Sequence, residues 1–166
     1  MKHAMKLLPA LGLALCLGFL SACSGGSQPA GGAPAKLETL DMGAVEKHFA
    51  ANKGKVTFVM FWATWCPACK TELPVLEQLR AKYKADKLDI MAISVDDTPE
   101  AMATFLKGRP TTLDVYLSKA DVGSEFGVKS IPALYVLDKE GQVAFNSSGV
   151  YPFDMLDTVI SQLVKG

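Results

Sequence analysis

A run of apolar residues from Lys55 to Trp62 constrains the fold of this chain more than any other feature. The run is almost uninterrupted and is rich in β-branched and aromatic side chains, which predicts a central strand covered on both faces. After Cys66 the pattern changes to Leu73, Leu76, Leu79 or Arg80, and Tyr83, with the helical spacing of three to four. A buried strand therefore leads directly into an amphipathic helix.

Strands and helices alternate along the rest of the chain. The same periodicities predict strands over 88–95, 112–117, 133–137 and 143–147, helices over 98–107 and 120–126, and a closing helix that carries Phe153, Leu156, Ile160, Leu163 and Val164. The last two strands flank a turn at Lys139-Glu140-Gly141-Gln142. This order predicts an α/β fold in which a mixed central sheet, with parallel central strands and an antiparallel edge, is flanked by helices on both faces.

The N-terminal segment has the layout of a secretory signal peptide over residues 1–22. Lys2 and Lys6 precede an uncharged apolar stretch, and small residues follow it. The alternative, a retained membrane span, requires roughly 17–25 apolar residues, more than this stretch provides. The sequence Leu20-Ser21-Ala22-Cys23 resembles the lipobox of bacterial lipoproteins, which implies that Cys23 is lipidated and anchors the chain to a membrane. A plain signal peptide that ends beside a cysteine is the other interpretation.

Residues 24–36 are dominated by Gly, Ser, Pro and Ala, which predicts a flexible tether between the lipidated Cys23 and a domain over 37–166. The formal net charge of +0 gives no electrostatic footprint for nucleic acid. Cleavage before Cys23 would remove Cys16 and make Cys23 a thioether. Cys66 and Cys69 would then be the two remaining thiols.

The segment Trp65-Cys66-Pro67-Ala68-Cys69 lies at the junction between the buried strand and the helix. Cysteines at i and i+3 on a first helical turn share one face and can close a small disulfide. The N–H groups and the positive dipole end of a helix N-terminus favour a thiolate at Cys66, and a thiolate is the species that attacks disulfides. Pro67 suits the first helical position. We therefore predict that Cys66 is the nucleophile and that the less exposed Cys69 resolves the mixed disulfide.

Other roles for this pair are less well supported. A structural disulfide that closes so small a loop would stabilise the fold little. A zinc site needs two further ligands, which the processed chain does not offer in a second Cys pair. Two thiolates alone can bind Cu(I), so a copper-carrying protein is the alternative to an enzyme. In a peroxiredoxin the reactive Cys follows a Thr by three residues, whereas Thr64 precedes Cys66 by two.

The segment 61–74 resembles the active site of the thioredoxin superfamily, especially its TlpA/ResA-like branch of exported thiol-disulfide oxidoreductases. Ile131-Pro132 is similar to the cis-proline loop of that family, and the resemblance covers nearly all of 37–166. It implies a thioredoxin-like fold with Pro132 cis beside the dithiol, although most X-Pro bonds are trans. It also implies that the backbone near Ile131 pairs with an extended substrate.

The resemblance also implies roles for residues near the dithiol. Glu72 occupies a position where this branch carries an acid, and a desolvated carboxylate there can accept the proton of Cys69; the alternative is a solvated Glu in the first turns of a helix. Thioredoxin itself has a buried Asp where this chain has Met60. Trp65 is predicted to contact substrates, Trp62 to pack in the core, and His48 to lie on a helix surface.

The function implied is an exported, membrane-anchored enzyme that reduces protein disulfides, as in cytochrome c maturation. The Cys66/Cys69 pair would be its redox centre, with no other cofactor and no metal. A membrane thiol relay of the DsbD or CcdA kind would supply electrons. A protein that donates disulfides instead is the second enzymatic interpretation.

Overall fold

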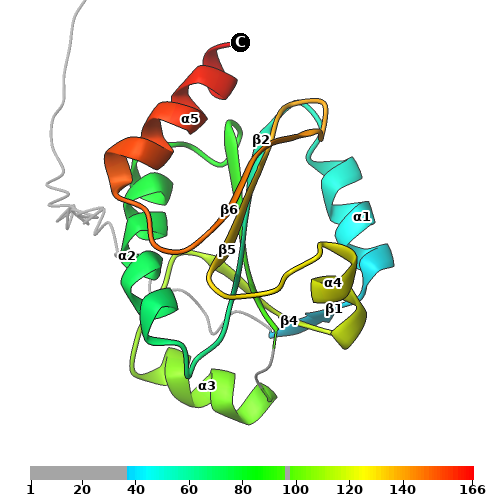
Figure 1. Ribbon diagram of the computed structural model, residues 1–166, viewed down its shortest axis with the longest axis vertical. Helices are drawn as coiled ribbons and strands as arrows, with labels where there is room; N and C mark the ends of the chain where they lie inside the picture. Colours follow the sequence, from blue (N-terminus) through cyan, green and yellow to red (C-terminus); the bar gives the residue numbers. More distant parts are fainter. Residues whose placement is uncertain (1–36, 96–97) are drawn as a thin grey trace, which may run out of the picture. The chain divides into compact units, whose positions relative to one another are not determined.

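A computed structural model describes residues 37–95 and 98–166 of the protein (Figure 1). The predicted signal peptide over 1–22, the lipidation site Cys23 and the tether over 24–36 lie outside the described residues. Among the residues that are described, no helix is both long enough and apolar enough to cross a membrane.

A single mixed sheet forms the centre of the fold. Its strands are β1 (Glu38–Leu40), β2 (Val56–Trp62), β3 (Leu88–Ser94), β4 (Asp114–Ser118), β5 (Ala133–Leu137) and β6 (Val143–Ser148), in the order β1-β4-β3-β2-β5-β6. The first four strands of that order run parallel, whereas β5 is antiparallel to β2 and β6 is antiparallel to β5. The predicted parallel centre and antiparallel edge are confirmed.

Helices cover both faces of this sheet, as predicted (Figure 1). They are α1 (Met42–Ala51), α2 (Pro67–Lys82), α3 (Pro99–Lys107), α4 (Ala120–Glu125) and α5 (Phe153–Lys165). The core on one face includes residues of α2, α3 and α5, and the core on the other includes residues of α1 and α4. The α/β architecture therefore has three layers.

The sequence of β2 carries almost no polar residue because the whole strand is buried. Every residue from Val56 to Trp62 is buried. Phe58 and Met60 pack on the side of α2, while Val59 and Phe61 pack on the side of α1 and α4. Because successive side chains of a strand alternate between faces, a strand covered on both sides must be apolar at nearly every position.

The predicted elements after β2 are all present, and the boundaries that were predicted differ from the observed ones by at most two residues. Thr98 caps α3 by accepting a hydrogen bond from the Ala101 N–H at 3.2 Å, as its position before Pro99 predicts. The β5–β6 turn is closed by Asp138, whose Oδ1 accepts hydrogen bonds from the N–H groups of Glu140 and Gln142. Gly141 takes a left-handed φ of 84° in this turn, where a side chain would be strained.

The sequence analysis missed β1 and gave no bounds for α1, although it placed His48 on a helix. The helix does carry a start signal, because Asp41 is its N-cap and its Oδ1 accepts a hydrogen bond from the Ala44 N–H at 3.0 Å. Strand β1 has only three residues and gains its hydrogen bonds from β4, far away in the sequence. A strand this short carries too little periodicity to be recognised from its own residues.

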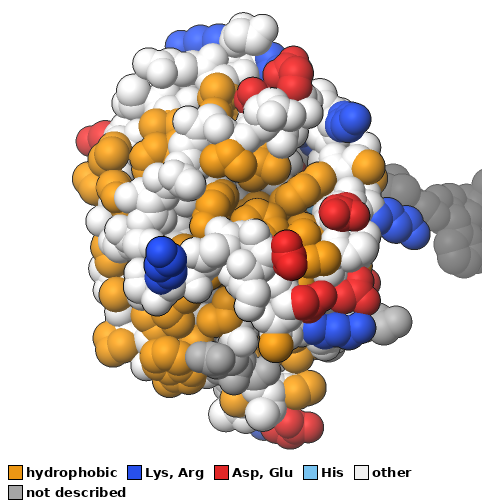
Figure 2. Space-filling model, turned by 45° about the vertical axis from the view of Figure 1, so that its right-hand side comes forward, with side chains coloured by type: hydrophobic (Ala, Val, Ile, Leu, Met, Phe, Trp, Pro, Cys, Tyr) orange, Lys and Arg blue, Asp and Glu red, His pale blue; other side chains and the backbone are white. Residues whose placement is uncertain are grey.

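On the face of the molecule drawn in Figure 2, hydrophobic side chains collect across the middle and the Lys and Arg side chains are dispersed, whereas several Asp and Glu side chains lie close together on the right-hand side. A continuous basic stripe is what binding to a phosphate backbone requires. This face shows no such stripe.

Candidate active site

Cys66 stands where β2 gives way to α2. It is the N-cap of the helix, its backbone is extended, and its Sγ accepts a hydrogen bond from the Cys69 N–H at 3.1 Å. Pro67 follows at the first helical position, where the missing N–H costs nothing. A sulfur in this place is polarised by an N–H group and by the positive end of the helix dipole, and both favour a thiolate once the pair is reduced.

Cys66 and Cys69 are joined by a disulfide, with their Cα atoms 5.3 Å apart. The two sulfur-bearing residues differ in access, since Cys66 is 5% exposed and Cys69 is fully buried. The structure therefore shows the oxidised form of the pair. The difference in access agrees with the predicted order of roles, in which the outer cysteine reacts with substrate and the inner one follows.

The loop before β5 lies against this disulfide. The Ile131–Pro132 peptide bond is cis, as the resemblance implied, and the Ile131 carbonyl oxygen lies 3.9 Å from Cys66 Sγ. Strand β5 pairs with β2 antiparallel, so the start of β5 lies beside the end of β2. This pairing brings together two segments separated by 65 residues.

A shallow hollow of about 330 Å³ adjoins the disulfide. It is lined by Trp65, Val95, Val128, Lys129, Ser130 and Ile131. Trp65 is 59% exposed, the largest exposure among the large hydrophobic side chains of the described residues. Pro67 is exposed as well, whereas Pro132 is buried. Of the predicted contact residues, Trp65 and Pro67 thus flank Cys66 in the chain and Ile131 lies against it, whereas Pro132 is buried.

Glu72 is fully buried, which rules out the solvated alternative. Its Oε2 accepts a hydrogen bond from the Tyr151 N–H at 3.0 Å, and its Oε1 has no hydrogen-bond partner among the described residues. Burial raises the pKa of the Glu72 carboxyl, and the Tyr151 hydrogen bond offsets part of that rise. Glu72 follows Cys69 by three positions on α2, so both lie on the same side of the helix. Such a carboxyl is suited to proton transfer.

Sequence reasoning did not identify Tyr151 as part of this site. Its contribution is a backbone N–H, which every residue except proline possesses, and its partner is 79 residues away. The signal in the sequence was a neighbouring glycine, Gly149, which indicates a turn. In the structure its φ of 116° lies in the region that favours glycine.

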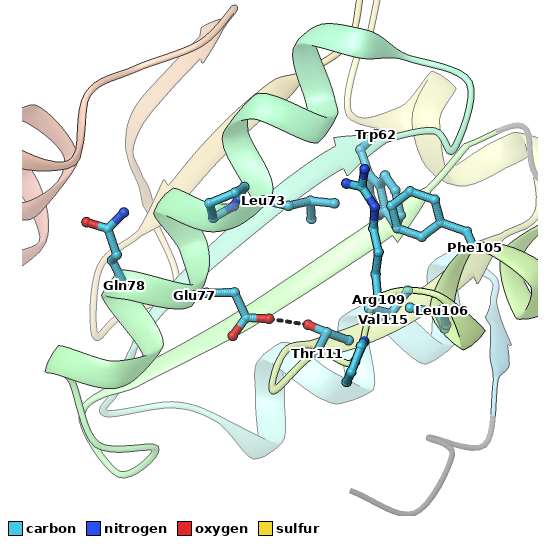
Figure 3. Close-up of a pocket in the computed structure, with 11 residues that line it drawn as sticks. Trp62, Leu73, Glu77, Gln78, Phe105, Leu106, Arg109, Thr111 and Val115 are labelled. Atoms are coloured by element: carbon cyan, nitrogen blue, oxygen red, sulfur yellow. Dashed lines mark hydrogen bonds between the residues drawn. The ribbon is translucent and has the colours of Figure 1, made fainter. Parts of the chain in front are cut away.

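A larger pocket of about 420 Å³ lies behind the active-site helix, between α2 and α3. In Figure 3, Leu73 points towards Trp62, with Phe105 and Arg109 beside it. The Trp62 and Phe105 rings lie 5.2 Å apart, and the Arg109 guanidinium lies 5.2 Å from the Phe105 ring centre. Glu77 closes the other wall by accepting hydrogen bonds from the Thr111 hydroxyl and the Thr112 N–H. Trp62 is fully buried, as predicted, and lines this pocket on the side of Phe105.

Two further residues from the sequence analysis lie away from the disulfide or contribute no polar group to it. Met60 is buried in the core and leaves no carboxylate at the position of the thioredoxin Asp. His48 is not a free surface residue: its Nε2 lies 2.7 Å from Asp89 Oδ2, and both side chains are largely buried. His48 does lie on a helix, α1, as predicted, but its pairing with Asp89 of β3, 41 residues away, was not predicted.

Among the residues that the structure describes, no three or more His, Cys, Asp or Glu side chains gather in a metal-binding arrangement. The cysteine pair stands alone in chemical terms, with Glu72 the acid nearest to it along α2. Two sulfurs and one carboxyl, next to an exposed hollow, can exchange disulfides and move one proton.

The residues from 54 to 143, more than half of the chain, match the model of a family described as thioredoxin-like. The chain belongs to the thioredoxin-like family. The predicted superfamily and fold are thereby confirmed, because the matched range contains β2, the Cys66–Cys69 pair, the cis-proline loop and β5.

Relatives within the thioredoxin-like family have redox names. The chain is 30% identical, over 67% of its own length, to the thiol-disulfide oxidoreductase ResA of Bacillus thuringiensis subsp. konkukian, and spans 65% of that protein. It is 33% identical to the thioredoxin-like protein YneN of Bacillus subtilis, over 55% of each chain. The chain thus spans less than two thirds of the curated relatives it matches first.

A solved structure of MTB DsbF, in mixed oxidized and reduced forms, superposes with a TM-score of 0.60 at 30% identity. The match covers 68% of this chain and 84% of that one. The named relatives support a redox role for the dithiol, and the structural match supports the thioredoxin-like fold.

Proposed function

We propose that this protein is a thiol-disulfide oxidoreductase that reduces disulfides in other proteins. The observation that carries the proposal is the Cys66–Cys69 disulfide at the N-terminus of α2, with the cis-proline loop 3.9 Å from Cys66 Sγ. In that position Cys66 keeps 5% exposure, whereas Cys69 is fully buried one helical turn inward. The names of the relatives agree with this chemistry.

The reaction starts from the reduced pair. The Cys66 thiolate attacks one sulfur of a substrate disulfide, an S–S bond forms between Cys66 and the substrate, and the other substrate sulfur leaves as a thiolate. Cys69 then loses its proton and attacks Cys66. The second substrate thiolate departs, and the Cys66–Cys69 disulfide holds the oxidising equivalents, so that two electrons have passed to the substrate.

Substrate binding is assigned to the hollow beside Cys66. Trp65 and Ile131 provide apolar contacts there, and Lys129 provides the one ionic group among its lining residues. Ser130, two residues before the cis-proline, is exposed, and the backbone of this loop can pair with an extended segment. Glu72 is assigned as the group that accepts the proton of Cys69, because it is buried one turn further along α2.

The cellular setting follows from the N-terminal sequence. We infer export through the signal peptide over 1–22, lipidation at Cys23, and a position on the extracytoplasmic side of a membrane. A reductase in an oxidising compartment needs a continuous supply of electrons. A membrane thiol relay of the DsbD or CcdA kind fits that need, and cytochrome c maturation is a process that uses such a reductase. Replacement of Cys23 by Ser should release the protein from the membrane fraction.

Single-cysteine variants test the chemistry directly. Cys66→Ala should abolish reduction of a protein disulfide such as that of insulin, whereas Cys69→Ala should accumulate mixed disulfides through Cys66. Full activity of Cys66→Ala would show that the nucleophile is misassigned. Tight, stoichiometric Cu(I) binding by the wild type without any disulfide turnover would favour the copper carrier instead.

The direction of electron flow is tested in the cell. Acid quenching, thiol alkylation and a gel shift report the redox state of Cys66 and Cys69. A reductase supplied by a membrane relay is expected to be mostly reduced. A mostly oxidised pair would contradict the reductase and favour a protein that donates disulfides.

A further inference from the structure

The segment from Gly149 to Tyr151, which we call the β6–α5 connector, touches both halves of the active site. At one end, the Gly149 N–H donates a hydrogen bond to the Pro132 carbonyl oxygen at 2.9 Å. At the other end, the Tyr151 N–H donates a hydrogen bond to Glu72 Oε2 at 3.0 Å. Two backbone hydrogen bonds, made by residues two positions apart, therefore join the cis-proline loop to the buried acid on α2.

The Glu72 carboxyl depends on this connector for its state of ionisation. Its side chain is fully buried, and Tyr151 provides the hydrogen bond that the described residues make to it. Burial favours the neutral acid, whereas an N–H donor favours the carboxylate. The second oxygen, Oε1, has no partner among the described residues, so it is available to a proton donor.

The connector is held in place by its own residues. The Tyr151 hydroxyl is hydrogen-bonded to the Ser147 hydroxyl, and the Tyr151 ring meets the Phe145 ring edge-on with centroids 5.9 Å apart. Gly149 adopts a φ of 116°, which a residue with a side chain adopts only under strain. The N–H of Tyr151 is thus presented to Glu72 by a backbone path that requires glycine and by a side chain fixed to β6.

We propose that the Tyr151 backbone N–H is a positioning group for the reaction: it holds the Glu72 carboxyl through Oε2 and leaves Oε1 free to take the proton of Cys69. This inference rests on the proposed function. In the step concerned, the proton moves from the Cys69 thiol to Glu72 Oε1, the Cys69 sulfur bonds to the Cys66 sulfur, and the substrate leaves as a thiolate. Gly149 keeps the connector attached to the loop that binds the substrate.

The test removes the N–H and compares the result with a variant that keeps it. Tyr151→Pro lacks the donor, and Tyr151→Ala loses the same aromatic ring but retains the N–H. Two quantities are measured: the titration of the Glu72 carboxyl by ¹³C NMR, and the release of thionitrobenzoate when Cys69 resolves a mixed disulfide formed on Cys66 with Ellman's reagent.

In Tyr151→Pro the Glu72 titration should move to higher pH than in Tyr151→Ala, because the ionised form loses its donor. Thionitrobenzoate release at neutral pH should fall by about tenfold, and its pH profile should move in the same direction. Identical titrations in the two variants would overturn the proposal. If Tyr151→Pro does not fold, a backbone ester at Tyr151, which replaces only the N–H by oxygen, gives the same comparison against the wild type.

A pair of glycine variants tests the other anchor. Gly149→Ala should move the Glu72 titration in the same direction by displacing the connector. Gly141→Ala, at a φ of 84° in the β5–β6 turn with similar open space, is the matched control and should leave that titration unchanged.

The proposal and the proposed function fail in different ways. A shifted Glu72 titration in Tyr151→Pro, combined with normal turnover in Glu72→Gln, would retain the positioning bond but remove Glu72 from the reaction. An unchanged Glu72 titration in Tyr151→Pro, combined with slow turnover in Glu72→Gln, would overturn the positioning role of Tyr151 and keep Glu72 in the reaction.

Discussion

The chemistry of Glu72 is determined by its surroundings more than by its residue type. An exposed glutamate on the first turns of a helix is an ordinary anion, whereas this one is enclosed and has a single hydrogen-bond donor. Burial is the larger influence and raises the pKa of its carboxyl. The group can therefore exchange a proton at a pH where a solvated glutamate remains fully ionised.

Glu72→Gln should slow the resolution of the mixed disulfide by about 100-fold, the lower end of what a general base contributes. In the wild type, the rate should decrease as the pH falls through the raised pKa of Glu72, because only the carboxylate accepts the proton of Cys69. The variant should lack this part of the profile. Thionitrobenzoate release measures both effects, and Glu77→Gln on the same helix is the control. A wild-type profile retained in Glu72→Gln would remove the residue from the proton path.

His48 predicts a second pH dependence, this time of stability. The hydrogen bond with Asp89 raises the pKa of His48, and burial opposes part of the rise. A raised histidine pKa stabilises the fold fully below the unfolded value of 6.5, and this stabilisation is lost as the pH rises through the folded value. Urea unfolding between about pH 6 and pH 9 should show this decrease in the wild type and not in His48→Gln.

Asp114 provides the control for this experiment. Burial, followed by the nearby charge of Asp89, raises the pKa of the Asp114 carboxyl. The free energy of unfolding that depends on Asp114 therefore decreases as the pH rises above the ordinary value of 3.8. Asp114→Asn should change the stability profile in the acidic range and keep the decrease above pH 6.5. If the decrease in stability above pH 6.5 were absent in Asp114→Asn, His48 would not be the group responsible for it.

Residue roles were predictable where they depend on neighbours in the sequence. The positions of Cys66, Pro67 and Cys69 follow from their spacing after a buried strand. The burial of Glu72 and the pairing of His48 depend on partners 79 and 41 residues away, which no local pattern reveals. For the same reason, the sequence could not predict that Glu72 Oε1 has no hydrogen-bond partner among the described residues.

At the scale of elements, α2 is the helix on which the site is built, and contacts along its length fix it. Glu77 is hydrogen-bonded to Thr112 before β4, and Tyr83 at the end of the helix donates a hydrogen bond to Asp157 Oδ1 of α5 at 2.7 Å. These contacts hold the helix at points beyond the disulfide. The N-terminus of α2, and with it Cys66, is thereby supported from the far end of the helix.

Tyr83→Phe should lower the free energy of unfolding by about 1.5 kcal/mol, because it removes a hydrogen bond to a carboxylate. A double-mutant cycle with Asp157→Ala isolates the energy of this contact. Lys82→Met, which removes the more exposed ion pair to the same Asp157, should cost less than about 1 kcal/mol. Additive effects of Tyr83→Phe and Asp157→Ala would show that the helices are held together by other contacts.

The elements were predicted from their apolar spacing wherever they are long or buried. Strand β2 and helices α2 and α5 have strong patterns, and the apolar residues that predicted them lie within or directly beside these elements. Strand β1 was missed, and α1 was predicted only as a helix around His48, without bounds. The three residues of β1 are stabilised by pairing with β4, and only Val45 of α1 is fully buried, so the apolar stripe of that helix is weak.

At the scale of the whole molecule, two apolar cores share one sheet. Strand β2 contributes to both of them, since its side chains alternate between the α2 side and the α1 side. A defect in this strand therefore affects both layers of helices at once. We expect the described domain to unfold as one cooperative unit for that reason.

Phe58→Ala should cost about 3–5 kcal/mol, the usual loss for a fully buried aromatic ring. That is a large part of the stability of an ordinary domain, about 5–15 kcal/mol. Val143→Ala is the control: this residue is 54% exposed on the edge strand β6, and its removal should change stability by less than about 0.5 kcal/mol. Urea unfolding followed by circular dichroism and by tryptophan fluorescence measures both variants, and non-coincident transitions would contradict a single unit.

The path of the chain places its last residue conveniently for experiment. Helix α5 ends at Lys165, next to Gly166, at one extreme of the domain, while α2 begins with its disulfide at the opposite end of the sheet (Figure 1). A biotin, an affinity tag or a sensor surface joined to Gly166 would face away from arriving partners. Cys69→Ala protein immobilised by its C-terminus would thus present Cys66 outward, ready to capture its clients covalently from an extract.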